Sequence, residues 1–383
     1  MQTLSFLDTH SLIAITTLCL ASVAQLYFYL QYYLRTLSLS ENDTLIPSQG
    51  ISIVLYADHN LELLQAHLPA FLSQKHPCFE LIIVNDGSST QMEDYIQALS
   101  QQYDNIYYTY LSDDARNLSR KKMTLTLGIK AARYDWICLS DVACQPLSDH
   151  WLTTCEQAIQ LQQASFAIGP VVWNKKNEST DLFVQLDKLL YNLRMLAYGQ
   201  IHRPYGTVNS NLFFEKSLFF KHKGFAKQMH LLAGEDILWI ELLRKTVKGV
   251  TLTHPHSTLI KQRDAYTNYW KQEKQIHAFT RQFASTLPTL IFSIENLSRY
   301  MYYGAALYCI YLAPNIELKL LFAVAILLRM ISVAIFWYKA ARKYLPTSQY
   351  TSFLAFELLY PIVDLGFRIH NLWTKKKYYT WRI

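Results

Sequence analysis

Two aspartates stand directly after short apolar stretches in the first half of the chain. Asp86 follows ELIIVN, and Asp141 follows YDWICLS. Such runs predict buried parallel strands, and the ligands of open α/β sheets bind beyond the carboxyl ends of their strands. Carboxylates placed there could accept hydrogen bonds from a nucleotide or hold a divalent cation. Asp86 taken alone is equally compatible with a turn, because N-D-G-S is a common turn sequence.

A third acidic site opens a later apolar stretch. Glu235 and Asp236 lie within LLAGEDILW, where adjacent acids are either favourable charges at a helix N-terminus or a general base at the mouth of a pocket. The cation chemistry has a gap, because the residue two after Asp141 is Ala143. A divalent cation normally takes more than one hard oxygen ligand from the protein.

The elements that must position these acids alternate between strand and helix over residues 45–285. Strands are predicted at 51–56, 80–84, 106–110 and 134–140, and helices at 61–73, 92–99 and 123–132. This alternation favours an α/β domain with a mostly parallel sheet. In such a sheet the first two aspartates would share one edge.

Both ends of the chain are apolar. Residues 11–34 carry no charge over a span long enough to cross a bilayer, and the first ten residues lack the Lys or Arg of a signal peptide, which favours an uncleaved anchor. Residues 289–313 and 316–338 predict a hairpin that the following KAARK returns to the cytoplasm. Residues 352–373 contain titratable side chains that are costly at mid-bilayer, and we expect them to lie in the inner interface.

Charge and cysteine content narrow the class of protein. The formal net charge of +7 is spread along the chain, which suits anionic membrane lipids and gives no patch for nucleic acid. The six cysteines form no CxxC pair, so we expect reduced thiols and a cytosolic main domain. The predicted organisation is a transmembrane anchor over 1–40, an α/β domain over 41–285, and a membrane hairpin with a membrane-associated helix and basic tail over 286–383, in the inner cell membrane.

The order of these blocks resembles the family 2 glycosyltransferases, in particular the membrane-bound bacterial members. The similarity rests on NDGSS after the second predicted strand, and on KKMTLTLGIKAARYDWICLSDVACQP, GTVNSNLFFEKSLF, GFAKQMHLLAGEDILW and YWKQEKQ further on. It implies a GT-A fold, a Rossmann-like nucleotide half merged with an acceptor half. It also implies inverting transfer of a sugar from a nucleotide sugar, with UDP as the favoured nucleotide, to a lipid-linked or polysaccharide acceptor at the cytoplasmic face of the membrane.

On the donor side, the resemblance implies a nucleotide-sugar site formed by four residues and one cation. Asp86 would accept from the uracil, with Ala57 at the end of the first strand beside it. Lys122 would face the phosphates, with Lys121 as the less favoured alternative. Asp141, the first acid of the family's D-x-D motif, would contact the ribose or a Mg²⁺ or Mn²⁺ ion bound to the diphosphate.

On the acceptor side, the resemblance implies a general base and a binding surface. Asp236 would take the proton of the acceptor hydroxyl, and Glu235 would support it. Four further residues would shape the acceptor and diphosphate side: Gly206, Asn211, Trp270 and Gln272.

The chain departs from the family pattern around the diphosphate. Ala143 replaces the second D-x-D acid, Gln275 replaces the arginine of the family's QxxR motif, and His59 and Asn60 stand where the family has Asn-Glu. One interpretation is an active enzyme with weaker metal dependence, aided by a histidine of THPHS, although that stretch is also an ordinary turn sequence. The alternative is a catalytically degenerate member that serves as a scaffold in a glycan-assembly complex.

Overall fold

The computed structural model describes residues 9–37, 49–58, 60–87, 89–112, 119–173, 179–207, 210–262, 266–345 and 353–373. Contacts divide the chain into two compact units. The first, here called the helical unit, comprises Met1–Ser38 and Thr286–Gly366. The second, the α/β unit, comprises Leu39–Ser285 and Phe367–Ile383.

The α/β unit is built on a seven-stranded sheet with the order β3-β2-β1-β4-β8-β6-β9. Its strands are β1 (Ile51–Ala57), β2 (Phe79–Asn85), β3 (Ile106–Tyr110), β4 (Trp136–Asp141), β6 (Phe166–Ile168), β8 (Leu212–Glu215) and β9 (Gly249–Thr251). Only β8 runs antiparallel to its neighbours. The predicted mostly parallel sheet is therefore confirmed, and the four predicted strands match β1 to β4 within two residues at each end.

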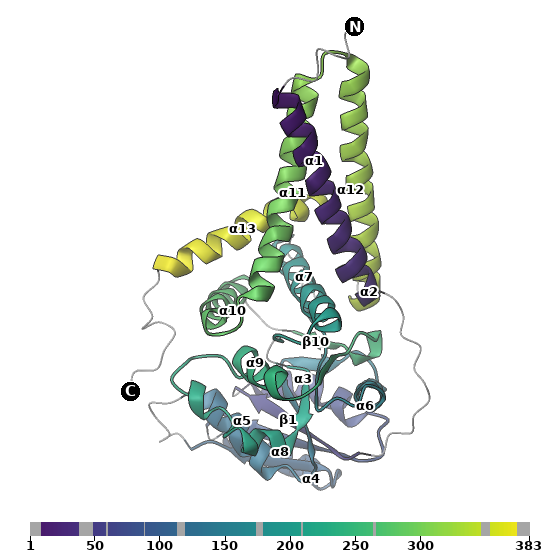
Figure 1. Ribbon diagram of the computed structural model, residues 1–383. Coiled ribbons are helices and arrows are strands. Elements are labelled where there is room, and N and C mark those ends of the chain that lie inside the picture. Colours follow the sequence, from purple (N-terminus) through teal and green to yellow (C-terminus); the bar gives the residue numbers. More distant parts are fainter. Residues whose placement is uncertain are drawn as a thin grey trace. The chain divides into compact units, whose positions relative to one another are not determined.

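Helices pack against the strands of this unit and against one another. They are α3 (Leu61–Leu72), α4 (Thr90–Ser100), α5 (Arg120–Ala131), α6 (Trp151–Leu161), α7 (Ser179–Ile201), α8 (Lys216–Lys221), α9 (Ile237–Thr246) and α10 (Tyr266–Thr280) (Figure 1). Asn60 caps α3 by accepting from the backbone of Leu63 at 2.9 Å. Gly128 lets α5 lie close to β1 and β2, since a Cβ there would stand 2.5 Å from Val54 and 2.6 Å from Val84.

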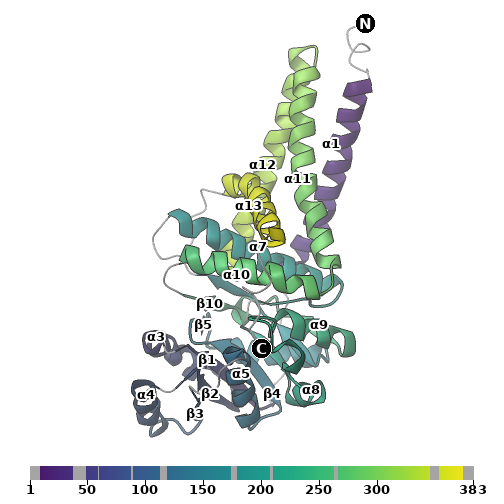
Figure 2. The same cartoon turned by 90° about the vertical axis from the view of Figure 1, so that its left-hand side faces the viewer.

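A second, three-stranded sheet has the order β5-β10-β7 (Figure 2). Its strands are β5 (Cys144–Pro146), β7 (Val171–Trp173) and β10 (Leu259–Lys261). β10 pairs antiparallel with β5, so that Lys261 lies opposite Cys144, and the backbone of Gln262 donates to the carbonyl of Ala143 at 2.8 Å. A strand from late in the chain is thus fastened beside the end of β4.

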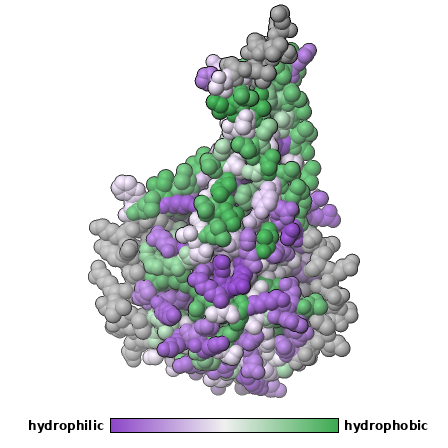
Figure 3. Space-filling view, viewed as in Figure 1, coloured by the Kyte–Doolittle hydropathy of each residue, from purple (hydrophilic) through white to green (hydrophobic). Residues whose placement is uncertain are grey.

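The helical unit contains four long helices. α1 (Thr9–Tyr27) continues through a π-helical turn (Phe28–Tyr33) into α2 (Leu34–Leu37), and α11 (Leu287–Leu312), α12 (Ile316–Tyr344) and the first part of α13 (Phe353–Trp373) complete it. α1 and α11 lie side by side, as do α11 and α12 (Figures 1 and 2). Their outer surface is largely apolar (Figure 3). Among described residues, Thr9–Leu37 and Ile316–Tyr344 are long and apolar enough to cross a membrane, a criterion of length and composition that α11 does not meet.

A network of buried charges lies inside the helical unit, and two of its members belong to α11. Glu295 and Arg299 of α11 pair with each other, and Arg299 also reaches Glu357 of α13 at 3.1 Å. Arg329 of α12 donates to Glu357 at 2.9 Å and to Gln25 of α1 at 3.0 Å. All four charged side chains are less than a tenth exposed. Glu357, which counted against a spanning helix in the sequence, has two arginine partners inside the unit.

Candidate active site

The carboxyl ends of β1, β2 and β4 meet at one edge of the large sheet. The register pairs Ala57 with Asn85 and Tyr56 with Asp141. The backbone of Asp86, directly after β2, donates to the carbonyl of Ala57 at 3.0 Å. The predicted donor-side residues of β1, β2 and β4 therefore lie on three adjacent strand ends.

Asp86 is held by side chains from two other elements. One carboxylate oxygen accepts from Nε of Arg120 at 2.7 Å, and the other accepts from the Tyr56 hydroxyl at 3.0 Å. Burial and the neighbouring Asp86 carboxylate raise the pKa of Tyr56, which keeps its hydroxyl protonated as a donor. A turn residue needs no such arrangement, so Asp86 is an oriented acceptor at the sheet edge.

Asp141 is buried and paired with a lysine that the sequence analysis did not single out. Its Oδ1 accepts from the backbone of Ala143 at 2.6 Å, and its Oδ2 lies 3.3 Å from Nζ of Lys261. Burial disfavours the charged form of Lys261, but the carboxylate of Asp141 outweighs it, and the pKa of Lys261 is raised well above its usual value. The one signal in the sequence is a lysine that closes the apolar strand LIK.

The N-terminus of α9 carries the predicted base. Oδ1 of Asp236 accepts from the backbone of Ile237 at 2.6 Å. Its Oδ2 lies 3.4 Å from Nε2 of His277 and, among described residues, has no partner in hydrogen-bond geometry. Asp236 is 1% exposed. A buried carboxylate oxygen in this state can accept a proton from a bound hydroxyl.

Glu235 has a different surrounding from its neighbour. It lies 2.7 Å from Nζ of Lys121 and 3.8 Å from Nζ of Lys122. Burial alone would raise the pKa of Glu235, but these two ammonium groups outweigh it and hold the pKa well below its usual range. Glu235 is therefore ionised and paired with the two lysines, which leaves Asp236 as the candidate proton acceptor of the two.

The two lysines of α5 differ in access. Lys122 is fully buried and donates to the carbonyl of Leu231 at 2.6 Å. Burial, with the adjacent Lys121, lowers the pKa of Lys122. Lys121 is partly exposed, and its Nζ lies 5.5 Å from the centre of the Tyr56 ring, near the sheet edge where β1, β2 and β4 end. The geometry therefore favours Lys121, the alternative of the sequence analysis, as the lysine that faces the donor.

α10 turns a different face to the site than its motif predicts. Gln272 is exposed, and Nε1 of Trp270 donates to Asp187 of α7 at 2.6 Å, which makes that ring a packing residue. The buried face instead carries Glu273, paired with a lysine of α7, and His277, beside Asp236. These two residues are four apart, a spacing that places them on one helix face. Helix periodicity could have found them where motif alignment did not.

The two predicted acceptor-side residues before α8 also differ. Asn211 adopts φ of 60° and is saturated, since its amide bonds Trp151, Pro170 and Ser257, so it joins loops within the fold. Gly206 lies against the base region, where a Cβ would stand 2.8 Å from Arg281. A side chain at position 206 would displace that arginine.

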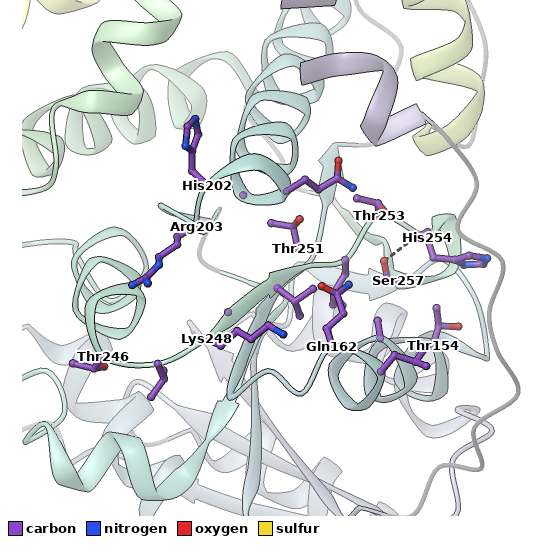
Figure 4. A pocket seen from close by; sticks show the side chains of 18 of the residues that line it. Thr154, Gln162, His202, Arg203, Thr246, Lys248, Thr251, Thr253, His254 and Ser257 are labelled. Carbon is purple, nitrogen blue, oxygen red and sulfur yellow. Dashed lines mark hydrogen bonds between the residues drawn. The ribbon is translucent and has the colours of Figure 1, made fainter. Parts of the chain in front are cut away.

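The histidines of THPHS lie at another surface. His254 precedes a short 3₁₀ turn (Pro255–Ser257) and accepts from the backbone of His256 at 3.1 Å. Figure 4 shows His254 at a cavity of about 660 Å³, which Arg203 and Lys248 also line. Its lining includes none of the four predicted acids, Asp86, Asp141, Glu235 and Asp236, so the cavity is distinct from the candidate site.

The comparisons with known proteins agree with this geometry. Residues 52–221 match the sequence profile of the family described as glycosyl transferase family 2. The chain carries a family 2 glycosyltransferase domain. The predicted recognition of the family is thereby confirmed.

Proteins similar to this chain were found in sequence and in structure. It is 28% identical over 120 residues to the poly-β-1,6-N-acetyl-D-glucosamine synthase of Staphylococcus aureus, a match that covers 31% of this chain and 28% of the relative. The chain thus matches little more than a quarter of the length of the curated relatives. A mannosyltransferase from Pyrobaculum calidifontis, solved with GDP-Man and Mn²⁺, is similar with a TM-score of 0.54 at 13% identity, over 94% of this chain and 98% of that one. This likeness confirms the predicted GT-A fold.

The predicted divalent cation does not fit the residues of this family 2 domain. Both oxygens of Asp141 are engaged by Ala143 and Lys261. Within the described part of the chain, no three His, Cys, Asp or Glu side chains form a group that could hold a metal ion. A Mg²⁺ or Mn²⁺ ion would therefore lack the carboxylate pair that such sites usually provide.

Proposed function

We propose that the α/β unit is an inverting glycosyltransferase that moves a sugar from a UDP-sugar to a lipid-linked or polysaccharide acceptor at the cytoplasmic face of the membrane. The observation that carries the proposal is the buried Asp236 oxygen at the N-terminus of α9. The preceding residue, Glu235, pairs with Lys121, whose Nζ lies over the Tyr56 ring near the end of β1. The relative that makes poly-β-1,6-N-acetyl-D-glucosamine supports a polysaccharide acceptor and makes UDP-N-acetylglucosamine the first donor to test.

The proposed reaction is a single displacement. Asp236 takes the proton of the acceptor hydroxyl, whose oxygen attacks the anomeric carbon while the bond from that carbon to the diphosphate oxygen breaks. UDP leaves with the electron pair, and the configuration inverts. Glu235 keeps Lys121 in place near the donor, where its charge stabilises the leaving diphosphate.

The experiment is a transfer assay with a panel of UDP-sugars and membrane lipid extract as the acceptor source. Incorporation of label from one UDP-sugar into lipid or polymer supports the proposal. A protein that binds UDP but gives no product with any donor would instead be the scaffold that the alternative interpretation describes.

Asp86→Ala is expected to weaken UDP binding by about tenfold or more. The substitution removes a carboxylate that would accept from the uracil, a loss on the order of 1–3 kcal/mol. It also removes the carboxylate that orients the side chains of Arg120 and Tyr56. Calorimetry with UDP measures the effect, and Asp94→Ala, an exposed site on α4, is the control. Equal UDP affinity in Asp86→Ala and wild type would assign Asp86 to the turn alone.

The membrane orientation gives a further prediction. With the α/β unit cytoplasmic, a cysteine at Gln101 is expected to resist membrane-impermeant thiol reagents in intact cells. A cysteine at Asn315, between α11 and α12, is expected to react. Both are placed in a chain whose exposed Cys19 is replaced by Ser. The reverse labelling pattern would refute the orientation.

A further inference from the structure

The leaving diphosphate of the proposed reaction needs positive charge beside it. A nucleoside diphosphate gains negative charge as the glycosidic bond breaks, and metal ions or Lys and Arg side chains supply the compensation. The solved mannosyltransferase similar in fold contains Mn²⁺. In this chain the family's second acidic ligand is Ala143, so the compensation must come from elsewhere.

A cationic side chain already lies against the remaining acid. Lys261 ends β10 directly opposite Cys144, the first residue of β5, and Ala143 immediately precedes that residue. Its Nζ lies 3.3 Å from Oδ2 of Asp141 and 3.5 Å from the hydroxyl of Tyr269. The side chain is 1% exposed, so solvent screens its charge little.

Backbone pairing fixes this lysine as firmly as it fixes the aspartate. β5 follows β4 after only two residues, and β10 binds β5 on one side and β7 on the other. A backbone hydrogen bond from Gln262 to the carbonyl of Ala143 also joins the end of β10 to the segment between β4 and β5. The ammonium group is therefore held at the carboxyl end of β4 by the sheet itself, in the way that a preorganised site requires.

We propose that Lys261 takes the place of the divalent cation, so that this chain binds the diphosphate of its donor without metal. The inference rests on the proposed function and deepens it. Asp141 orients the ammonium group instead of a metal ion. Without a divalent charge to balance, position 143 needs no second carboxylate, which is consistent with the alanine found there. Lys121 adds a second positive charge from α5, since one ammonium group carries half the charge of Mg²⁺ or Mn²⁺.

Calorimetric titration with UDP, in EDTA and in Mn²⁺, tests the proposal independently of activity. Wild-type affinity is expected to agree within about twofold between the two conditions. Lys261→Met, which keeps length and removes charge, is expected to lose about tenfold or more in both. Lys261→Arg should recover most of this loss. Lys216→Met, a lysine that donates to Ala132 at the opposite edge of the sheet, is the control and should bind as wild type.

Lys261→Met removes the lysine that pairs with Asp141 and could lose UDP binding because it misfolds. A double variant distinguishes misfolding from loss of the charge. Lys261→Met with Ala143→Asp restores the two family acids and is expected to bind UDP in Mn²⁺ but not in EDTA. Wild-type binding that needs Mn²⁺ would overturn the role of Lys261 and leave the proposed function standing. No UDP binding in either condition would overturn both.

Discussion

Replacement of Asp236 by Asn is expected to lower turnover by about 100-fold or more while UDP affinity changes by less than about twofold. The amide keeps the size of the side chain and can still cap α9, but it cannot take a proton from the acceptor. The Oδ2 atom that loses this ability is buried beside His277 and is free of hydrogen bonds among described residues. Because the loss lies in the chemical step, it should appear in kcat.

The control for this variant lies on the same helix. Glu241 is also buried, but it pairs with Arg244 and Lys245 on its own helix. Glu241→Gln is therefore expected to keep near wild-type turnover. Turnover in Asp236→Asn that matches Glu241→Gln would remove Asp236 from the role of base.

The second large effect is expected in the helical unit. Glu357→Gln removes the negative charge shared by Arg299 and Arg329. Breaking one member of a buried ion-pair network leaves an uncompensated charge, at about 3–5 kcal/mol. We therefore expect a clearly lower melting temperature for the detergent-solubilised protein, measured by loss of monodisperse protein on heating.

Charge balance separates this explanation from simple loss of packing. Arg329→Met combined with Glu357→Gln leaves the pair Glu295 and Arg299 neutral and should be less destabilised than Glu357→Gln alone. Glu317→Gln, at an exposed position near the start of α12, should melt as wild type. If Glu357→Gln were as stable as wild type, the charge network would contribute nothing to the stability of the protein.

Local patterns predicted the nucleotide half of the fold well. The strand 106–110 coincides with β3, and Asp86 and Asp141 stand at strand ends as their apolar runs indicate. The reason is that hydrophobic runs and turn residues are local properties of the sequence. The reversed direction of β8 and the short strands of the second sheet depend on pairings between distant segments, which no local pattern specifies.

The candidate site divides in the same way. Asp236 could be found because it begins a helix, a local feature. Lys261 and His277 could not be paired with their acids, because each contact joins segments far apart in the chain. For α10, motif alignment favoured Gln272, whereas burial selects the adjacent Glu273. Which side of a helix faces the site is decided by packing against the rest of the domain.

The second sheet has a consequence for how the domain is made. During synthesis, β1 to β4 can pair before residue 261 has left the ribosome, since chains fold from their N-terminal part as they emerge. Until β10 arrives, the end of β4 holds a carboxylate that lacks its buried cation. The region 52–221 that identifies the family contains neither Lys261 nor Asp236. An N-terminal fragment with every strand of the nucleotide half would therefore have the edge of the proposed site but not the charge of Lys261, and we expect it to bind UDP more weakly than the complete α/β unit.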